Sequence, residues 1–438
     1  MTQSTEAAAP IVLPDHVSLE QRVAPETVCP NCGHTGMRVF YRVNGIPAHS
    51  VLLMETREQA VNYPRRDLEL GFCPDCAFIG NVIFDPAVHE YSTRYEETQG
   101  FSQTFNSFAR ELARGMVTRY GLQDKSVLEI GCGKGEYLVM LVEEGAGRGI
   151  GIDPAYRDDR LKSPVLDRIE FIADFYSEKY THLSADFVCC RHTLEHIDQT
   201  KAFMEMVRRS IGPRYETTVF FELPDVVREL RDGAFWDMYY EHCSYFCPGS
   251  LARVFRETGF DVERIWYEFG DQYLMLTAKP AEGRTEASLD EERDLEAMTA
   301  MVDAFTDVCG RSLSKWGELL RTRKAAGERI APWGGGSKAV AFITTLGVEA
   351  EVDQVVDVNP HKHGRFLPGA GHEVIGPERL KEAPPQLVVV LFRVREIRAL
   401  PVERVTHRCV EAAFAHRFIP SVFWRRVRCA LRAPARSG

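Results

Sequence analysis

The amino-acid sequence predicts an α/β protein in which two doubly wound parallel sheets follow a small metal-binding domain. Three observations lead to this fold class: two Cys-Pro-x-Cys pairs near the N-terminus, an alternation of short apolar runs with helical stretches from Ser126 onward, and a second such alternation after residue 327. With 438 residues, the chain is long enough for two to three domains. We expect domains over residues 1–85, 86–280 and 327–424, a linker helix over 281–326 and a basic tail over 425–438.

The composition is that of a globular protein with an acidic balance. The formal net charge of -10 opposes non-specific attraction to nucleic acid or to anionic lipid. No apolar run is long enough to cross a bilayer, and the first fourteen residues lack the basic start and apolar core of a signal peptide. The sequence therefore predicts a cytoplasmic protein that binds neither membrane nor nucleic acid, and it leaves the oligomeric state open.

The two cysteine pairs are Cys29-Pro-Asn-Cys32 and Cys73-Pro-Asp-Cys76. Each spacing lets two thiolates reach one ion from a tight turn, and two such turns complete a tetrahedral site without an open position for water. We expect a structural Zn²⁺ bound by these four cysteines, although four unrelated buried thiols remain the alternative. The other cysteines are interpreted as packing residues.

The central part of the chain alternates strands with helices. An amphipathic stretch over residues 105–120 predicts a helix. Short apolar or β-branched runs then predict parallel strands over residues 126–130, 149–152, 169–172, 185–190 and 217–221.

A long helix separates the two α/β units. Ser288-Leu-Asp-Glu291 has the pattern of a capping box, and we expect it to open a helix whose apolar stripe extends to Leu320. The second unit is predicted from apolar runs over residues 329–333, 354–357 and 387–391.

Three glycines follow the strand predicted over residues 126–130. They are Gly131, Gly133 and Gly135 in the run Val127-Leu-Glu-Ile-Gly131-Cys-Gly133-Lys-Gly135. Without a Cβ, these residues let the backbone approach a ligand closely, and Asp153 at the end of the next strand suits a ribose diol. The G-x-G-x-G spacing, the acidic residue within the strand and an aspartate after the third strand resemble class I S-adenosylmethionine (SAM)-dependent methyltransferases with a Rossmann-like sheet. The cofactor-binding residues expected on this basis are Glu129, Gly131, Gly133, Gly135, Asp153 and Asp174.

Further motifs narrow the resemblance. After the cysteine pairs come His192-Thr-Leu-Glu-His196, Tyr239-Tyr-Glu-His242, Trp333-Gly-Gly-Gly-Ser-Lys338 and Val356-Asp-Val-Asn-Pro-His-Lys362. In this order they resemble the zinc-containing sugar C-methyltransferases that methylate C-3 of dTDP-linked 4-keto deoxysugars. Trp333 and an additional glycine depart from the usual form of the third-domain turn.

The resemblance implies roles for several residues. A methyl group can be added to carbon beside a ketone once a general base removes a proton and a donor stabilises the enolate oxygen. By resemblance, His242 is the base, Glu241 supports it, and Tyr239 and Tyr95 contact the substrate or enolate. His196 is a further catalytic candidate because it follows the fourth strand, where such sheets bind ligands, and closure of the SAM pocket without proton transfer is its alternative. Since adjacent residues of an extended segment face opposite ways, we expect Tyr239 and not Tyr240 to enter the site. The third, Rossmann-like domain is expected to bind the substrate nucleotide through Lys338, Lys362 or Arg365.

Other interpretations remain open. A hydrogen-bonded loop histidine without a catalytic role is the alternative for His242, and a solvated lid is the alternative for the third domain. Transfer to oxygen or nitrogen of another natural product needs the same base. A zinc-ribbon protein that modifies nucleic acid is disfavoured by the acidic balance, and a chain that only binds SAM is disfavoured by the Tyr-Tyr-Glu-His run.

Overall fold

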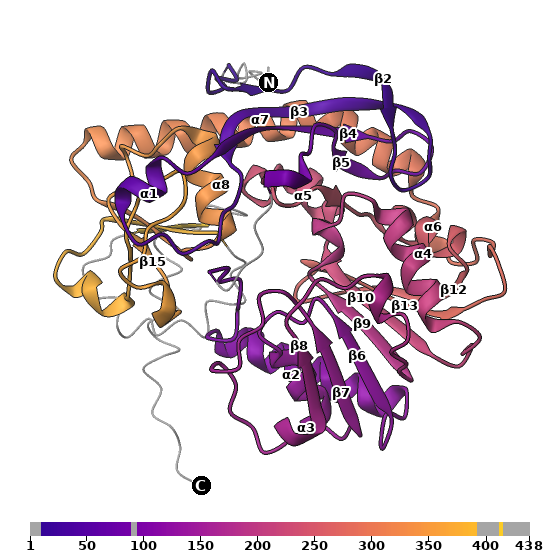
Figure 1. The fold of residues 1–438 in the computed structure, drawn as a ribbon. Helices are drawn as coiled ribbons and strands as arrows, with labels where there is room; N and C mark the ends of the chain where they lie inside the picture. The colour runs from indigo at the N-terminus through magenta and orange to yellow at the C-terminus, as the bar shows by residue number, and fades with distance from the viewer. Residues whose placement is uncertain (1–9, 89–93, 392–410, 415–438) are drawn as a thin grey trace, which may run out of the picture.

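The computed structural model describes residues 10–88, 94–391 and 411–414 and contains three β-sheets, each with its own strand order. Figure 1 shows the N-terminal strands lying across the two α/β units. None of the described helices combines the length and hydrophobicity that crossing a lipid bilayer requires. The expected basic tail, 425–438, lies outside the described residues.

The N-terminal sheet is antiparallel and has the order β1-β3-β4-β5-β11, with β2 paired to β3. Its members are β1 (Val17–Ser18), β2 (Arg22–Val28), β3 (Thr35–Pro47), β4 (Arg65–Phe72), β5 (Ile79–Asn81) and β11 (Ser244–Tyr245), and the short helix α1 (Arg57–Val61) joins β3 to β4. Strand β11 comes from the middle of the chain, where Ser244 pairs with Gly80. This pairing fixes the segment around residues 239–245 to the N-terminal domain.

The central sheet has the order β12-β13-β10-β9-β6-β7-β8, in which β13 is antiparallel to both β12 and β10 and the other pairs are parallel. Its strands are β6 (Ser126–Ile130), β7 (Arg148–Ile152), β8 (Ile169–Ile172), β9 (Phe187–Arg191), β10 (Thr218–Pro224), β12 (Phe260–Glu268) and β13 (Tyr273–Pro280). The five predicted parallel strands are confirmed. The final antiparallel pair was not predicted, because it ends the strand-helix alternation on which the prediction rests.

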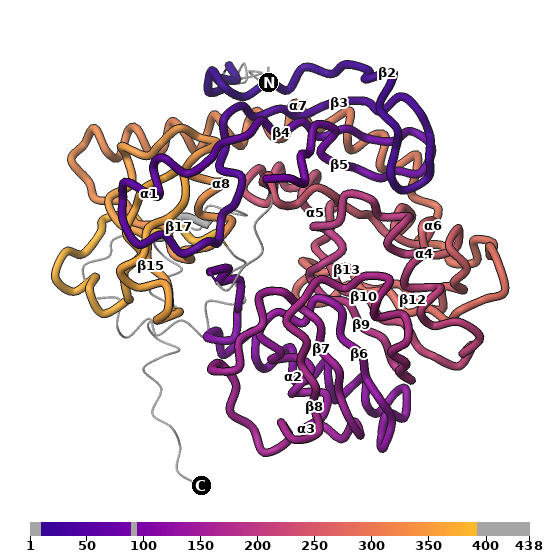
Figure 2. Tube along the Cα trace, viewed as in Figure 1, coloured from indigo at the N-terminus to yellow at the C-terminus, as the bar shows by residue number. Residues whose placement is uncertain are grey.

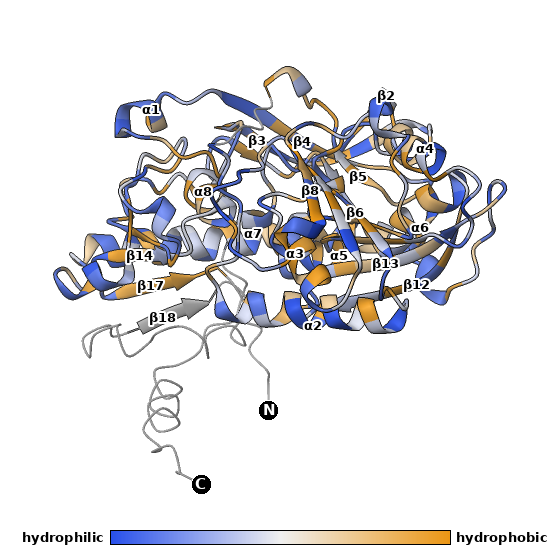
Figure 3. Cartoon of the chain, turned by 60° about the horizontal axis from the view of Figure 1, so that its bottom comes forward, coloured by the Kyte–Doolittle hydropathy of each residue, from blue (hydrophilic) through white to orange (hydrophobic). Residues whose placement is uncertain are grey.

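Helices cover both faces of this sheet. Along β6, Val127 packs with α2 (Gln103–Arg119) and α3 (Glu136–Glu143), whereas Leu128 packs with α4 (Thr200–Ile211) and α6 (Pro248–Glu257). Successive strand residues face opposite sides, so a sheet buried on both faces reads as a continuous apolar run. In Figure 3 the hydrophobic colour follows β14 and β17, whereas α2 alternates hydrophilic and hydrophobic residues.

The third sheet is parallel, with the order β16-β15-β14-β17-β18. It comprises β14 (Ile330–Trp333), β15 (Val355–Val356), β16 (Val374–Ile375), β17 (Leu387–Val390) and β18 (Glu411–Phe414), with α8 (Ser337–Leu346) after β14. The two edge strands β16 and β18 were not predicted. Counted from β14, the order is 3-2-1-4-5, as in a doubly wound sheet, which confirms the second Rossmann-like unit.

Helix α7 (Leu295–Ala325) runs beneath the N-terminal strands and contacts β3, α8 and α5 (Val226–Asp232) (Figure 2). Its predicted start was wrong: Glu292 accepts hydrogen bonds from the amides of Ser288 and Leu289 around a short 3-10 turn, and the helix begins only at Leu295. Glu292 is held in that turn by a buried ion pair with Arg256 on α6. One hydrophobic core joins α7 to the N-terminal sheet and to α8.

Phe305 is the residue on α7 that we expect to contribute most to this core. It is fully buried, and its ring lies 5.4 Å from that of Phe40 and 5.8 Å from that of Tyr41. Replacing a buried Phe by Ala costs about 3–5 kcal/mol. We expect Phe305→Ala to lower the chemical unfolding midpoint clearly and Phe305→Leu to lower it less. Equal midpoints for all three proteins would contradict the packing.

Candidate active site

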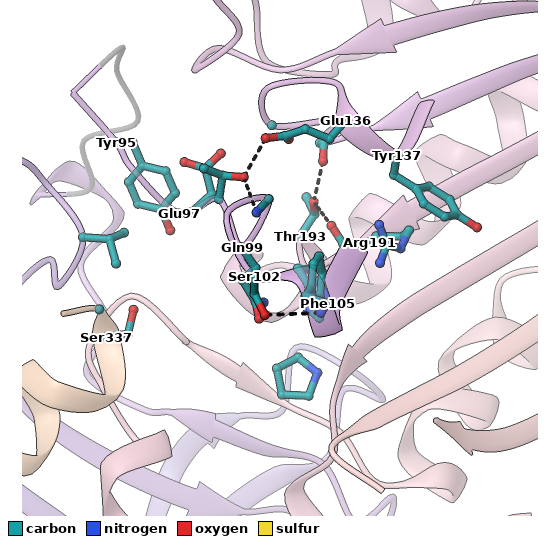
Figure 4. Close-up of a pocket in the computed structure, with 18 of the residues that line it drawn as sticks. Tyr95, Glu97, Gln99, Ser102, Phe105, Glu136, Tyr137, Arg191, Thr193 and Ser337 are labelled. Atoms are coloured by element: carbon teal, nitrogen blue, oxygen red, sulfur yellow. Dashed lines mark hydrogen bonds between the residues drawn. The ribbon is translucent and has the colours of Figure 1, made fainter. Parts of the chain in front are cut away.

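A cavity of about 940 Å³ lies where the three domains meet. It is lined from the N-terminal region by Val51 and Tyr95, from the central sheet by the glycine turn, and from the third domain by Ser337 and Asp357. In Figure 4, Tyr95 and Ser337 approach the pocket from one side, and Tyr137 and Arg191 approach it from the opposite side. The glycine turn follows the carboxyl end of β6, which is where doubly wound sheets bind ligands.

The glycine turn has the backbone that its sequence predicts. Gly131, Gly133 and Gly135 have φ angles of 69°, 55° and 86°. A Cβ on Gly131 would lie 2.0 Å from Thr193 Oγ1, and one on Gly135 would lie 2.4 Å from the ring of Phe171. Side chains at these positions would therefore be strained and would also collide with neighbours.

Two acidic side chains line the cavity beside this turn. Asp153 accepts hydrogen bonds from the amides of Gly133 (2.9 Å) and Ala155 (2.7 Å), and burial raises the pKa of its carboxyl. Burial likewise raises the pKa of Glu129 to about 8, against the opposing effect of Arg191. In the described part of the chain, Glu129 Oε2 is buried without a hydrogen-bond partner, so it has an acceptor available for a polar ligand.

Asp174, the third predicted acid, does not line the cavity. Its carboxylate pairs with Lys179 and accepts a hydrogen bond from the hydroxyl of Tyr180, and these contacts lower its pKa to about 2. Phe175 and Tyr176, the next two residues, line the cavity instead. The turn after β8 therefore directs the acidic side chain towards the surface.

Glu241 is a buried carboxylate that touches all three domains. It accepts hydrogen bonds from the Ser50 amide (2.8 Å), the Ser50 hydroxyl and Ser337 Oγ (3.4 Å), and it lies 2.9 Å from His49 Nδ1. Burial opposes ionisation, but the His49 and Ser50 contacts outweigh it and lower the pKa of Glu241 to about 2. The side chain is therefore an anchored anion.

His242 follows Glu241 and faces the cavity with Tyr239 and His196. The Tyr239 hydroxyl lies 3.0 Å from His242 Nε2, and the centroids of the His196 and His242 rings are 4.8 Å apart. His196 Nδ1 donates to the carbonyl of Glu241 at 2.9 Å. Burial, followed by the neighbouring His196, lowers the pKa of His242 to about 3, so the imidazole is neutral near pH 7.

The structure thus brings together Tyr95, His196, Tyr239, Glu241 and His242, the residues predicted for catalysis. Tyr240 points elsewhere, and its hydroxyl accepts a hydrogen bond from the Asp85 amide.

Lys134 connects the cofactor turn to the Tyr95 segment. Its ammonium group donates to the carbonyls of Tyr95 (2.8 Å) and Ala155 (3.0 Å) and lies 3.3 Å from Glu97 Oε2. Glu97 lines the cavity, and burial raises its pKa to about 7. Lys134 was not predicted as a site residue, although it lies inside the glycine motif. His49, Ser50 and Glu97 were not predicted either, because their partners are distant in sequence.

The third domain contributes two of the three predicted cations to the cavity. Lys338 pairs with Asp237 at 2.8 Å, and Lys362 lies 3.6 Å from Asp357, whose carboxylate also accepts from the Gly335 amide at 2.7 Å. Arg365 instead pairs with Glu55 outside the cavity. The two lysines are partly neutralised by their own aspartates.

The four paired cysteines converge at a separate place. The Cys29 and Cys76 sulfurs are 3.7 Å apart, and those of Cys32 and Cys73 are 3.6 Å apart. A tetrahedral zinc with Zn–S bonds of about 2.3 Å requires sulfurs roughly 3.8 Å apart. The other three sulfurs raise the pKa of the Cys76 thiol, so four thiolates here need a cation. Their spacing and charge fit Zn²⁺.

Two families match the chain. The family described as a methyltransferase domain matches residues 103–265, and the one described as a C-methyltransferase C-terminal domain matches residues 273–396. C-methyltransferase NovU from Streptomyces niveus is 26% identical over 393 residues, which cover 85% of this chain and 91% of the relative.

Two solved methyltransferase structures are each similar to less than half of the chain. A magnesium protoporphyrin IX methyltransferase from Synechocystis is 14% identical over 42% of this chain and 88% of its own, with a TM-score of 0.33. A 1,6-didemethyltoxoflavin-N1-methyltransferase from Burkholderia thailandensis is 15% identical over 41% of this chain and 82% of its own, with a TM-score of 0.30.

Gly131→Ala tests the role of the glycine turn. A left-handed conformation costs a non-glycine residue roughly 1–2 kcal/mol, and about 1.4 kcal/mol is a tenfold change in affinity. Because an alanine relieves this strain by moving the free turn out of the SAM-binding conformation, SAM must restore that conformation when it binds. We therefore expect SAM to bind about tenfold more weakly or worse, as measured by calorimetry. Gly115→Ala on α2, where a Cβ would meet nothing within 4 Å, is the control. Unchanged SAM affinity in Gly131→Ala would contradict the assignment.

Proposed function

We propose that this chain, a SAM-dependent C-methyltransferase, methylates C-3 of a dTDP-linked 4-keto deoxysugar and uses His242 as the general base. The main support for this proposal is that the glycine turn and the His242–Tyr239 pair line the same cavity. The similarity to NovU and to the C-methyltransferase C-terminal domain supports carbon as the acceptor. The dTDP-sugar follows from the sequence resemblance.

The chemistry begins at the carbon beside the ketone. His242 accepts the proton from that C–H bond, and the electron pair moves towards the ketone oxygen as an enolate. A neutral imidazole has a lone pair for this step, but a pKa of about 3 also makes His242 a weak base, so proton abstraction requires that the positive charge it acquires is compensated. The enolate carbon then forms the new C–C bond.

Bound SAM supplies an electrophilic methyl group on a sulfonium and leaves as the thioether after transfer. Asp153 would hold the ribose hydroxyls, Gly131 and Gly133 would allow close approach, and Glu129 offers an acceptor. Placing the acceptor carbon in line with the methyl group provides much of the rate enhancement of such a displacement.

The enolate oxygen requires a hydrogen-bond donor. Tyr239 donates a hydroxyl at the cavity wall, and Tyr95 enters from the N-terminal region. Burial raises the pKa of Tyr239, so its hydroxyl keeps its proton and can donate. Hydrogen-bond donors that are fixed where negative charge develops usually make the largest single contribution to the rate enhancement.

The third domain would hold the nucleotide end of the substrate. The α8 N-terminus, Ser337, Lys338 and Lys362 face the cavity opposite the glycine turn. Diphosphate binding would require Lys338 and Lys362 to turn from Asp237 and Asp357 towards the ligand.

His242→Asn tests the base. Wild-type protein incubated with SAM and a panel of dTDP-keto sugars should yield a product with a new C-methyl signal. Loss of a general base costs about 10²–10⁴-fold in rate, so we expect that loss in His242→Asn with SAM affinity nearly unchanged. His182→Asn, on an exposed histidine, is the matched control.

Deuterium exchange distinguishes methylation of carbon from methylation of oxygen or nitrogen. Enzyme without SAM should exchange the C-3 hydrogen of the substrate for deuterium, whereas an O- or N-methyltransferase would give no such exchange. A His242→Asn protein that methylates at the wild-type rate would show that the base lies elsewhere.

We also propose that Cys29, Cys32, Cys73 and Cys76 bind a structural Zn²⁺. Elemental analysis should find one zinc per chain in addition to any adventitious metal. Cys73→Ser should lose it and unfold at a lower temperature, because metal binding stabilises such small domains. Cys309→Ala, which removes a buried thiol outside the cluster, should keep the zinc. Equal zinc content in both variants would contradict the site.

A further inference from the structure

Glu195 is a buried carboxylate beside the two active-site histidines. It lies in the short 3-10 turn Leu194–His196 after β9, is 2% exposed and lines the cavity. Its Oε1 is 3.6 Å from His192 Nδ1, and one carboxylate oxygen lies within 4.8 Å of a ring nitrogen of both His196 and His242. In the described part of the chain, its Oε2 has no hydrogen-bond partner.

The other acidic groups near His242 already have partners. Glu241 is held by His49, Ser50 and Ser337, and Asp237 is shared between Lys338 and Arg228. Glu195 also has a neighbour, since its Oε1 lies 3.6 Å from His192 Nδ1, but among the described residues its Oε2 has no hydrogen-bond partner. That second oxygen can respond when the charge of the His242 ring changes.

Proton abstraction creates such a change. A protonated His242 would be a buried cation beside a second imidazole, and a buried charge is costly unless it is compensated. The groups facing Glu195 are the imidazoles of His192, His196 and His242 and the thiols of Cys190 and Cys243. Burial raises the pKa of both thiols, so they stay neutral and add no negative charge.

We propose that Glu195 is a positioning residue for the proton-abstraction step: its carboxylate orients the His196 and His242 rings and compensates the positive charge that His242 acquires. This inference rests on the proposed function, because it assigns the partner of the proposed base. It also explains why two imidazoles pack closely in a buried site.

Glu195→Gln keeps the shape of the side chain and removes its charge. Since general-base terms amount to about 10²–10⁴-fold, we expect a partial loss in kcat of about tenfold to a hundredfold. The KM and the SAM affinity should stay near wild type, and SAM-free deuterium exchange at the substrate carbon should slow in parallel. Glu195→Asp, which retains the charge, should recover part of the rate.

Two control variants separate this role from others. Glu178→Gln removes an exposed carboxylate and should match wild type. His192→Asn removes the 3.6 Å neighbour of Glu195. If kcat fell as much in His192→Asn as in Glu195→Gln, Glu195 would act through His192 and the proposal would be wrong. A loss confined to SAM affinity or unfolding temperature would equally show a structural role.

A measurement without substrate tests the role of Glu195 independently of the proposed substrate. Ring ¹⁵N resonances of His196 and His242, assigned with single His→Asn variants, should shift in Glu195→Gln and not in Glu178→Gln. Unchanged resonances would overturn the proposal even if the enzyme methylates sugars. Shifted resonances in a protein that methylates no sugar would refute only the substrate assignment. A second zinc per chain that disappears in Glu195→Gln would also overturn the proposal, because Glu195 would then be a metal ligand.

Discussion

The carboxylate of Glu241 is the contact on which the rest of the site depends. It is carried by the central segment, bound by His49 and Ser50 of the N-terminal domain and contacted by Ser337 at the start of α8. A buried anion is stable only when donors surround it, so the three domains must meet in one arrangement to satisfy it. Because His242 is the next residue, the same contact sets where the proposed base stands.

The cavity around it contains several buried charges, and they are arranged in local pairs. Arg228 and Lys338 share Asp237, and Arg191 and His192 share Glu222. Burial opposes the charge on His192, but Glu195 and Glu222 outweigh it and raise its pKa to about 9. The neutral His242 thus stands among charged neighbours, so a proton that it accepts changes the local balance. Compensation by Glu195 follows from this arrangement.

Much of the fold was predictable because it depends on local patterns. The five parallel strands of the central sheet appear as apolar runs because both faces are buried, and the glycine turn appears because Gly131, Gly133 and Gly135 have positive φ. The β12–β13 pair was missed because a short turn, and not the crossover helix of a parallel unit, joins these two strands. The start of α7 was misplaced because Glu292, and not Glu291, caps the preceding amides.

By itself, the sequence determined the parallel strands of the central sheet, the order of the α/β units, the glycine turn and the spacing of the four cysteines. All of these depend on neighbours a few residues apart along the chain. Only the tertiary structure decided that Lys338 meets Asp237 and that His49, Ser50 and Ser337 converge on Glu241. Such partners lie on different elements, and burial decides which of them must pair, because an unpaired charge away from water is too costly to keep.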